Sequence, residues 1–452
     1  MKVHFIAIGG SAMHNLALAL HDLGYQITGS DDEVFEPSKS RLKTKGLLPP
    51  SMGWFPEKIT QDLDAVILGM HARIDNPELA RAKELRLKVY SYPEYLFEAA
   101  KNKKRIVIGG SHGKTSITSM ILHVLQDQNI EADYMVGAQL EGFTNMVKIT
   151  KSAPIMILEG DEYLSSPIDR RPKFHLYHPH IALLSGVAWD HINVFPTFAN
   201  YVLQFQLFAD LIENNGSLIY YQGDVELVKI AEHARTDINT IPYNTPDFEI
   251  ENGETHLIFK GKRYPLQIFG NHNLQNLRGA WHVLNQLGLE DEQILNSIQS
   301  FKGASKRLEV VIKTNKTAIY KDFAHSPSKL KATTSALKQQ FPDRTLVACM
   351  ELHTFSSLNK EFLEQYNGAM DKADIAYVYY NPHTLEHKKL PPISPELVAA
   401  GFNNPGIRVI TNSDVMVDDL RKMDWNDRNL LLMSSGNFDG LDFKELAASL
   451  LH

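Results

Sequence analysis

Two segments of the chain, about a hundred residues apart, open with the same pattern of an apolar strand, a glycine pair and a helix. In the first, VHFIAIGG is followed by SAMHNLALALHDLG, where apolar side chains recur at roughly helical intervals. In the second, RIVIGG is followed by SHGKTS and the apolar segment ITSMILHVLQ. A short apolar strand joined through glycines to a helix is typical of a parallel sheet covered by helices. The pattern therefore predicts at least two α/β domains.

The rest of the sequence extends this organisation to three domains. After the second opening, Asn252-Gly253 lies between two alternating segments, which predicts a hairpin, and a second turn is expected at residues 260–262. An amphipathic helix is expected at residues 273–288, and a third series of strands begins after residue 305. We predict the α/β class, with N-terminal and C-terminal Rossmann-like domains and a central parallel sheet that carries a small β extension. The predicted domain bounds are 1–102, 103–304 and 305–452.

Charge and cysteine content narrow the possible partners. The net charge is -7, and the basic cluster KNKKR at residues 101–105 is too short to indicate binding to nucleic acid or to an anionic membrane. The single cysteine, Cys349, excludes an internal disulfide framework and fits a reducing compartment. The apolar stretch at the N-terminus is too short for a secretory signal or a membrane span. These features predict a cytoplasmic protein that acts on small molecules.

The second opening has the context of a phosphate-binding loop, since Gly-Lys-Thr stands between a strand and a helix. Backbone N–H groups at the helix N-terminus would face phosphates, Lys114 would add a positive charge, and the hydroxyl of Thr115 suits Mg²⁺. The generic pattern requires a glycine where this chain has Ile108. A plain glycine-rich turn is the alternative. For His112, shaping the turn and contacting a nucleotide both remain open.

Polar residues at other predicted strand ends add candidate ligands. Glu159, Asp161 and Glu162 follow the next strand, where a doubly wound sheet would deliver carboxylates beside the loop, although a solvated acidic turn would have the same composition. Further along, Asp190 and His191 follow another strand, and an ion such as Mg²⁺ often takes only one or two ligands from the protein. Weaker candidates, each with an ordinary structural alternative, are His272, Asn273, Asn276, Arg307, Asp322 and His325.

Taken in order along the chain, these motifs resemble those of the Mur ligase family of ATP-dependent amide-forming enzymes. IGGSAM is similar to that family's UDP-binding loop and GGSHGKTS to its ATP loop, and EGDEY, WDH, GNHNLQN, KRLE and DFAHSP are similar to its later motifs. The resemblance covers nearly the whole chain. It implies a UDP-sugar domain, a central P-loop ATPase-like domain, and a C-terminal domain that binds the incoming amine and closes over ATP.

The resemblance also implies roles for individual residues, with Mg²⁺ as cofactor and ATP as co-substrate. The implied catalytic residues are Lys114, Glu159, His191, Arg307 and Asp322. The implied metal ligands are Thr115, Glu159 and His191. The implied ATP-binding residues are Gly110, Ser111, His112, Gly113, Lys114, Thr115, Ser116, Asn276, Arg307 and Asp322. The implied UDP-sugar contacts are Gly9, Gly10, Ser11, Ala12, Met13, Ser30, Asp31 and His71.

Within the family, the segment DEYLSSPIDRRPKFHLYHP at residues 161–179 is similar to ligases that attach a murein tripeptide. The resemblance therefore implies that UDP-N-acetylmuramate is joined to L-Ala-γ-D-Glu-meso-diaminopimelate in peptidoglycan recycling, with ligation to L-alanine as the alternative. A nucleotide-driven switch that makes no bond is a third possibility, but it would leave the first domain and Arg307 unexplained. The sequence does not predict the oligomeric state.

The chain departs from the family pattern in three regions. Ser185-Gly186 and Ala188 replace the usual asparagine and acidic residue before Asp-His, which puts local contacts in doubt. Residues 200–208 contain no lysine that could be carbamylated as in several relatives, and Gln204 is expected to fill that space. His353 stands where tripeptide ligases often have an arginine.

Overall fold

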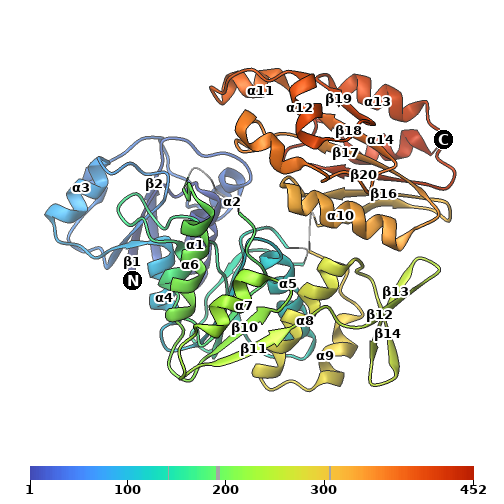
Figure 1. Cartoon of the computed structure of the whole chain (residues 1–452). Coiled ribbons are helices and arrows are strands. Elements are labelled where there is room, and N and C mark those ends of the chain that lie inside the picture. Colours follow the sequence, from blue (N-terminus) through green and yellow to red (C-terminus); the bar gives the residue numbers. More distant parts are fainter. Residues whose placement is uncertain (141, 190–193, 305–306, 452) are drawn as a thin grey trace. The chain divides into compact units, whose positions relative to one another are not determined.

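The computed structural model describes residues 1–140, 142–189, 194–304 and 307–451 (Figure 1). Contacts among these residues divide the chain into two units. The first unit comprises Met1–Asn244 and Gly279–Ile294, and the second comprises Thr245–Arg278 and Leu295–His452.

The N-terminal part of the first unit is a parallel sheet with the order β2-β1-β3-β4. Its strands are β1 (Lys2–Ile6), β2 (Gln26–Ser30), β3 (Ala65–Leu68) and β4 (Val89–Ser91). Its helical segments are α1 (Ser11–Asp22), α2 (Ser38–Thr44), η1 (Pro56–Lys58), α3 (Pro77–Glu84) and α4 (Tyr92–Ala100). The glycine pair at the end of the first apolar run brings the chain from β1 to α1, as the sequence predicts.

A second sheet of the same unit has the order β11-β10-β9-β5-β8-β6-β7. Neighbouring strands are parallel except for β6 and β7, which are antiparallel. The strands are β5 (Lys104–Gly109), β6 (Asp133–Met135), β7 (Val147–Lys148), β8 (Ile155–Glu159), β9 (Ile181–Leu184), β10 (Ser217–Tyr221) and β11 (Asn239–Tyr243). The helical segments along this part are α5 (Lys114–Asp127), η2 (Lys173–Leu176), α6 (Phe198–Asp210) and α7 (Val225–Glu232), followed later in the chain by α8 (Asn271–Gln286) and α9 (Asp291–Ile298).

Side-chain caps explain where several of these helices begin. At the start of α4, the Ser91 hydroxyl accepts a hydrogen bond from the backbone N–H of Glu94, whose carboxylate in turn accepts from the Ser91 N–H at 2.7 Å. The carboxylate of Asp224 accepts from two backbone N–H groups at the start of α7. Such caps satisfy N–H groups that have no partner within the helix. These caps set the first residue of each helix.

The predicted β extension is present as an antiparallel sheet of β12 (Phe248–Glu251), β13 (Glu254–Phe259) and β14 (Lys262–Leu266). Both predicted turns are confirmed, at Asn252-Gly253 and at Lys260–Lys262. Its contacts place it in the second unit, where the Gln340 amide donates to the carbonyl of Gly253 at 2.7 Å and accepts from the Thr255 hydroxyl at 2.9 Å. This extension therefore packs on the C-terminal end of the helix α10 (Pro327–Gln340).

The sheet of the second unit has the order β15-β16-β20-β17-β18-β19, and its strands are parallel apart from the antiparallel pair β15 and β16. The strands are β15 (Glu309–Lys313), β16 (Thr317–Asp322), β17 (Thr345–Glu351), β18 (Ile375–Tyr379), β19 (Ile407–Ile410) and β20 (Arg428–Met433). The helical segments are α10 (Pro327–Gln340), η3 (Lys360–Tyr366), α11 (Pro382–His387), α12 (Pro395–Phe402), α13 (Ser413–Arg421) and α14 (Phe443–Leu450). One face of the sheet packs on α13 and α14 through a core that includes Ile319, Met416 and Leu446.

Within the part of the chain that the structure describes, no helix is long and apolar enough to cross a membrane. The predicted α/β class, with parallel-dominated sheets and a small β extension, is confirmed. The predicted domain bounds at 102/103 and 304/305 stay predictions, since the two units divide the chain at other positions.

Candidate active site

The phosphate-loop candidate connects β5 to α5, as the sequence predicts. Gly110 has φ +126°, and a Cβ atom at this position would lie 2.2 Å from Oγ of Ser185. Gly113 precedes the first helical residue in a left-handed conformation with φ +82°. Glycine therefore serves here to let the loop turn back tightly against β9, with its backbone at the N-terminus of α5.

The segment after β9 braces this loop through its backbone and one hydroxyl. The Ser111 N–H donates to the carbonyl of Gly186 at 2.9 Å, and the Ala188 N–H donates to Oγ of Ser111 at 2.8 Å. The Ser185 hydroxyl donates to the carbonyl of His112 and, at 3.3 Å, to that of Gly109. The departures at residues 185, 186 and 188 therefore support the loop, because small residues and backbone groups make the contacts.

Lys114 is surrounded by carboxylates within the candidate site. Its ammonium donates to the Gly110 carbonyl at 2.6 Å and to the Glu162 carboxylate at 2.7 Å, and Glu162 is buried. Burial alone would lower the pKa of Lys114, but the carboxylates of Glu162, Asp161 and Glu159 outweigh it and raise this pKa above the ordinary lysine value. Lys114 is therefore protonated at neutral pH, and an incoming phosphate would have to share it with Glu162.

Glu162 is held in turn by the helix α6. The hydroxyl of Tyr201 donates to Oε1 of Glu162 at 3.0 Å and lies 2.9 Å from Oγ of Ser111. Both Tyr201 and Ser111 are buried. The loop, its lysine and Glu162 thus form one connected polar network in the interior, which fixes the lysine in place before any ligand arrives.

The hydroxyl of Thr115 and the carboxylate of Glu159 lie together beside the loop. Thr115 donates to Oε1 of Glu159 at 2.8 Å, and the Gly137 N–H donates to Oε2 at 2.9 Å. Burial raises the pKa of Glu159, although Gly137, Lys114 and Thr115 all oppose the shift. An adjacent hydroxyl and carboxylate are hard oxygen donors of the kind that Mg²⁺ accepts.

The remaining metal candidate, His191, and the neighbouring Asp190 lie outside the described residues. Among the residues that the structure describes, no group of three or more His, Cys, Asp or Glu side chains gathers in a way that could hold a metal ion. The pair Thr115 and Glu159 fits Mg²⁺, because this ion usually keeps several waters and takes only one or two protein ligands.

Asp161 belongs to a separate ion pair at the same turn. Its Oδ2 lies 2.5 Å from Nζ of Lys173, and Lys173 and Lys114 outweigh the effect of burial and lower the pKa of Asp161 to about 2. Along the same segment, the Arg171 guanidinium pairs with Asp169 at 2.7 Å. The Lys173–Asp161 pair ties residues 169–173 to the acidic turn that presents Glu162 to Lys114, whereas the Arg171–Asp169 pair lies within that segment.

The structure shows where the Gln204 side chain lies, but the expectation that it fills the space of a carbamylated lysine stays a prediction. The Gln204 side chain donates to the carbonyl of Asn200 in its own helix at 3.0 Å, and the backbone carbonyl of Gln204 lies 2.7 Å from Nε2 of His175. The α6 side chain that reaches the acidic turn is Tyr201. No sequence pattern indicated this contact, because the exact helical position decides which side chain faces the loop.

The UDP-sugar candidates gather at the carboxyl ends of β1, β2 and β3. Oδ2 of Asp31 accepts from the Gly9 N–H at 2.7 Å, and a Cβ atom at Gly9 would lie 2.7 Å from a methyl of Val34. Ser30 and Met13 are buried, whereas Ser11, Ala12 and His71 are exposed, and Gly10 caps α1. The structure therefore brings Gly9, Gly10, Ser30 and Asp31 together, and their role in sugar binding stays a prediction.

We expect UDP-sugar affinity to depend on Asp31 ionisation. Burial raises the pKa of Asp31 to about 6, so the carboxylate that holds the Gly9 amide exists mainly above that pH. A charged acceptor binds an N–H more strongly than a neutral one. The dissociation constant for the UDP-sugar should rise several-fold as pH falls from 7.5 to 5. In Asp31→Asn this pH dependence should vanish; an unchanged titration curve in that variant would contradict the prediction. Calorimetric titration at each pH measures both.

The candidates of the later motifs belong to the second unit. The Asp322 carboxylate accepts from the Thr333 hydroxyl at 2.7 Å, and the Arg307 guanidinium lies 5.0 Å from the centre of the Phe323 ring. Asn276 is buried on α8. Burial lowers the pKa of His272, which the nearby Asp322 partly offsets. The nucleotide contacts expected of Asn276, Arg307 and Asp322 stay predictions.

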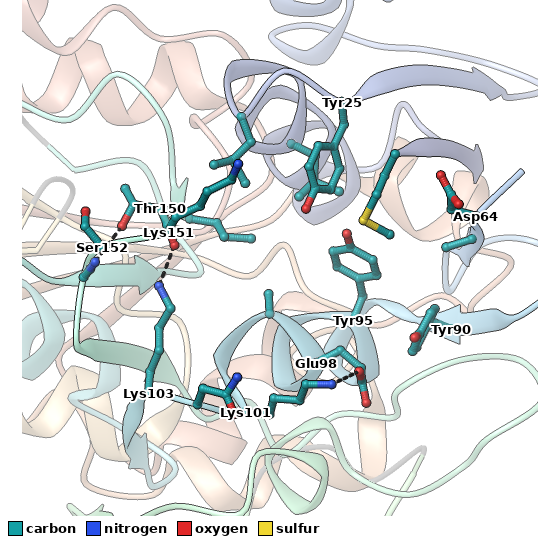
Figure 2. Close-up of a pocket in the computed structure, with 18 of the residues that line it drawn as sticks. Tyr25, Asp64, Tyr90, Tyr95, Glu98, Lys101, Lys103, Thr150, Lys151 and Ser152 are labelled. Atoms are coloured by element: carbon teal, nitrogen blue, oxygen red, sulfur yellow. Dashed lines mark hydrogen bonds and ion pairs between the residues drawn. The ribbon is translucent and has the colours of Figure 1, made fainter.

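A cavity of about 520 Å³ lies elsewhere in the first unit (Figure 2). Its wall includes Asp64, Lys103 and Pro154, which stand at the amino ends of β3, β5 and β8, and Figure 2 shows the hydroxyls of Tyr25 and Tyr95 directed toward one another across it. The phosphate-loop candidate follows the opposite, carboxyl end of β5, and parallel sheets bind their ligands at that edge. The cavity is therefore separate from the candidate active site.

Comparison with known proteins identifies the family. The model "Mur ligase family, catalytic domain" matches residues 2–104, "Mur ligase middle domain" matches 108–284, and "Mur ligase, glutamate ligase domain" matches 306–436. The UDP-N-acetylmuramate–L-alanine ligase of Clostridium kluyveri is 30% identical to this chain over 381 residues, which are 81% of each protein.

Solved structures show the same fold at lower identity. The murein peptide ligase of Psychrobacter arcticus matches with a TM-score of 0.65 and 22% identity, covering 100% of this chain and 98% of that one. The UDP-N-acetylmuramate–alanine ligase of Thermotoga maritima matches with a TM-score of 0.68 and 18% identity over the same shares. The resemblance drawn from the motifs and the three-domain architecture are confirmed. The chain therefore belongs to the Mur ligase family and is an ATP-dependent, ADP-forming ligase that makes carbon–nitrogen bonds between an acid and an amino acid or peptide.

Proposed function

We propose that the protein joins the carboxylate of UDP-N-acetylmuramate to the amine of L-Ala-γ-D-Glu-meso-diaminopimelate, in the cytoplasm and for the reuse of cell-wall peptides. The observation that carries this choice is the segment of residues 161–179, whose pattern resembles that of tripeptide ligases. Its Lys173–Asp161 pair supports the pattern as a working part of the site, since it ties the segment to the turn that carries Glu162. The solved murein peptide ligase that the chain resembles is consistent with this choice.

Ligation to L-alanine is the second candidate. It is favoured by the relative from Clostridium kluyveri, and by a second UDP-N-acetylmuramate–L-alanine ligase, from Lactiplantibacillus plantarum, which is 30% identical over 91% of this chain. Both candidates share the same first half-reaction and differ only in the amine.

The chemistry places separate demands on the site. The sugar carboxylate attacks the γ-phosphorus of ATP, ADP leaves, and the amine then attacks the acyl phosphate and releases inorganic phosphate. Each step brings anions together, so we assign Lys114 to stabilising the transferring phosphoryl group. When bound, Mg²⁺ would neutralise phosphate charge beside Thr115, Glu159 and, by prediction, His191. Arg307 and Asp322 are assigned to the nucleotide from the C-terminal domain.

Two assays test the proposal. With ATP, Mg²⁺, UDP-N-acetylmuramate and either amine in separate reactions, the tripeptide should give the faster amide formation. If the carboxylate of the sugar carries ¹⁸O, one labelled oxygen should appear in the inorganic phosphate, because the carboxylate oxygen bonded to phosphorus stays with it. No amide with either amine would contradict the proposed substrate pair, and faster turnover with L-alanine would favour the second candidate.

A further inference from the structure

Arg41 of α2 lies where the sugar-loop helix α1 meets the segment before β7. One guanidinium nitrogen donates to Oδ1 of Asn15 at 2.9 Å and to Nε2 of His14 at 3.1 Å. The other donates to the carbonyl of Thr144 and, at 3.4 Å, to Oδ1 of Asn145. Arg41 therefore contacts two residues of the N-terminal sheet domain and two residues more than a hundred positions further along the chain.

The geometry fixes the protonation of His14. A guanidinium has only donors, so Nε2 of His14 must accept, and its ring must be neutral with the proton on Nδ1. That nitrogen lies 3.0 Å from the carbonyl of Gly10, which it reaches as a donor. Burial also lowers the pKa of His14, which favours the neutral ring. Arg41 thus connects through His14 to the glycine loop at the start of α1.

From Asn15 and Asn145, the contacts continue to Glu159, the predicted metal ligand. The Asn145 amide donates to the carbonyl of Asn15 at 3.0 Å, and the Met146 N–H donates to Oδ1 of Asn15 at 3.2 Å. The Met146 carbonyl accepts from the Val136 N–H at 2.9 Å, and the next N–H, of Gly137, donates to Glu159. The path from Gly10 to Glu159 is made of side-chain and backbone hydrogen bonds and two short stretches of backbone, at Met146 and at Val136-Gly137.

We propose that Arg41 is a positioning residue for the ligase reaction. Through Asn15 and Asn145 it holds the Gly9–Gly10 loop in register with Glu159, so that a sugar carboxylate bound on one domain meets the phosphate bound on the other. This inference rests on the proposed function, because it requires the sugar at the first loop. The hydrogen bonds of Arg41 go to His14, Asn15, Thr144 and Asn145 and to neither candidate ligand loop directly. A displacement of about 1 Å between reacting groups can cost about 100-fold in rate, so a small loss of register has a large effect.

The test compares Arg41→Met, Asn145→Ala and the double variant with Arg81→Ala, because Arg81 is a half-exposed arginine of the same domain that pairs with Glu84 on the surface. We expect kcat for amide formation to fall about 100-fold in each of the first three, by the misplacement argument. The dissociation constants of ATP alone and of UDP-N-acetylmuramate alone should stay within about twofold of wild type, and the double variant should be no slower than either single one. Arg81→Ala should match wild type.

Three results would overturn the inference. One is an unchanged kcat in Arg41→Met. Another is a double variant whose loss in kcat equals the product of the two single-variant losses. The third is weakened binding of either nucleotide in a folded variant, since this indicates a merely structural role. If Arg41→Met does not fold, Arg41→Lys replaces it, because one ammonium keeps the charge but cannot reach four acceptors. The proposed function fails separately, if the wild-type protein forms no amide.

Discussion

Replacing Lys114 with alanine should reduce ADP release by at least about 1,000-fold, the scale reported for removing a cation or a preorganised donor at a phosphoryl or oxyanion site. The reason is electrostatic. Lys114 pairs with the buried carboxylate of Glu162, and its surrounding carboxylates keep it protonated, so it presents a full positive charge at the loop. Without it, the carboxylate of Glu162 would lose its ion-pair partner and would repel the phosphate.

The same variant should leave UDP-sugar binding within about twofold of wild type, because the candidate sugar loop is built from a different sheet. Calorimetric titration with the UDP-sugar measures this, and a coupled assay measures ADP. Lys229→Ala is the matched control, since Lys229 is an exposed lysine of the same unit that pairs with Glu226 on the surface. Equal loss of sugar binding and ADP release would contradict separate sites for the two nucleotides.

Replacing Gly110 with alanine should abolish detectable ATP binding. Two costs combine at this position. An L-residue is strained at φ +126°, by about 1–3 kcal/mol, and the new Cβ would lie 2.2 Å from Oγ of Ser185 and 3.0 Å from the Ser185 backbone nitrogen. The loop would have to move away from β9, which breaks the Ser111 and Ala188 hydrogen bonds and displaces the N–H groups that face phosphate.

A second-site variant separates the two costs. Gly110→Ala combined with Ser185→Gly removes the closest clash but keeps the backbone strain, so ATP binding should return only in part. Gly24→Ala is the control, since Gly24 also has positive φ, +86°, but a Cβ there would meet nothing within 4 Å. It should lose a little thermal stability and no ATP affinity, as measured by thermal melting and nucleotide titration. Normal ATP affinity in Gly110→Ala would show that the loop is not the phosphate site.

The sequence predicted the α/β class and the position of both glycine turns because those signals are local. Strands at the edges of the sheets were harder to predict from the sequence. β11 has only one buried residue and contains Pro242, which an edge strand tolerates, and β7 has two residues. β15 is another edge strand, and it pairs antiparallel with β16. Such strands depend on partners far away in sequence and carry little periodicity of their own.

The same distinction applies to the site. Gly-Lys-Thr between a strand and a helix is a local pattern, so Lys114 and Thr115 could be predicted. The partner of Lys114 could not, since Glu162 lies 48 positions away and the sequence offers three acidic residues in four positions. The three divide their tasks by geometry: Glu159 meets Thr115, Asp161 meets Lys173, and Glu162 meets Lys114.

The network around Tyr201 shows the limit of reasoning from relatives. The comparison with lysine-bearing relatives directed attention to Gln204, three positions along α6. Helical geometry turns that side chain back to Asn200, while Tyr201 reaches Glu162. The nucleotide contacts of Asn276, Arg307 and Asp322, in the second unit, remain assigned by resemblance. Alanine substitutions at these positions would be tested with the same ADP-release assay as the Lys114 variant.

One competition experiment tests the central claim most directly. The protein is given ATP, Mg²⁺ and UDP-N-acetylmuramate together with equal concentrations of L-alanine and L-Ala-γ-D-Glu-meso-diaminopimelate, and the UDP-linked products are separated by mass. The account predicts that the tripeptide adduct accumulates first, with one ADP released for each amide bond. Predominance of the L-alanine adduct, or ADP release without either adduct, would contradict it.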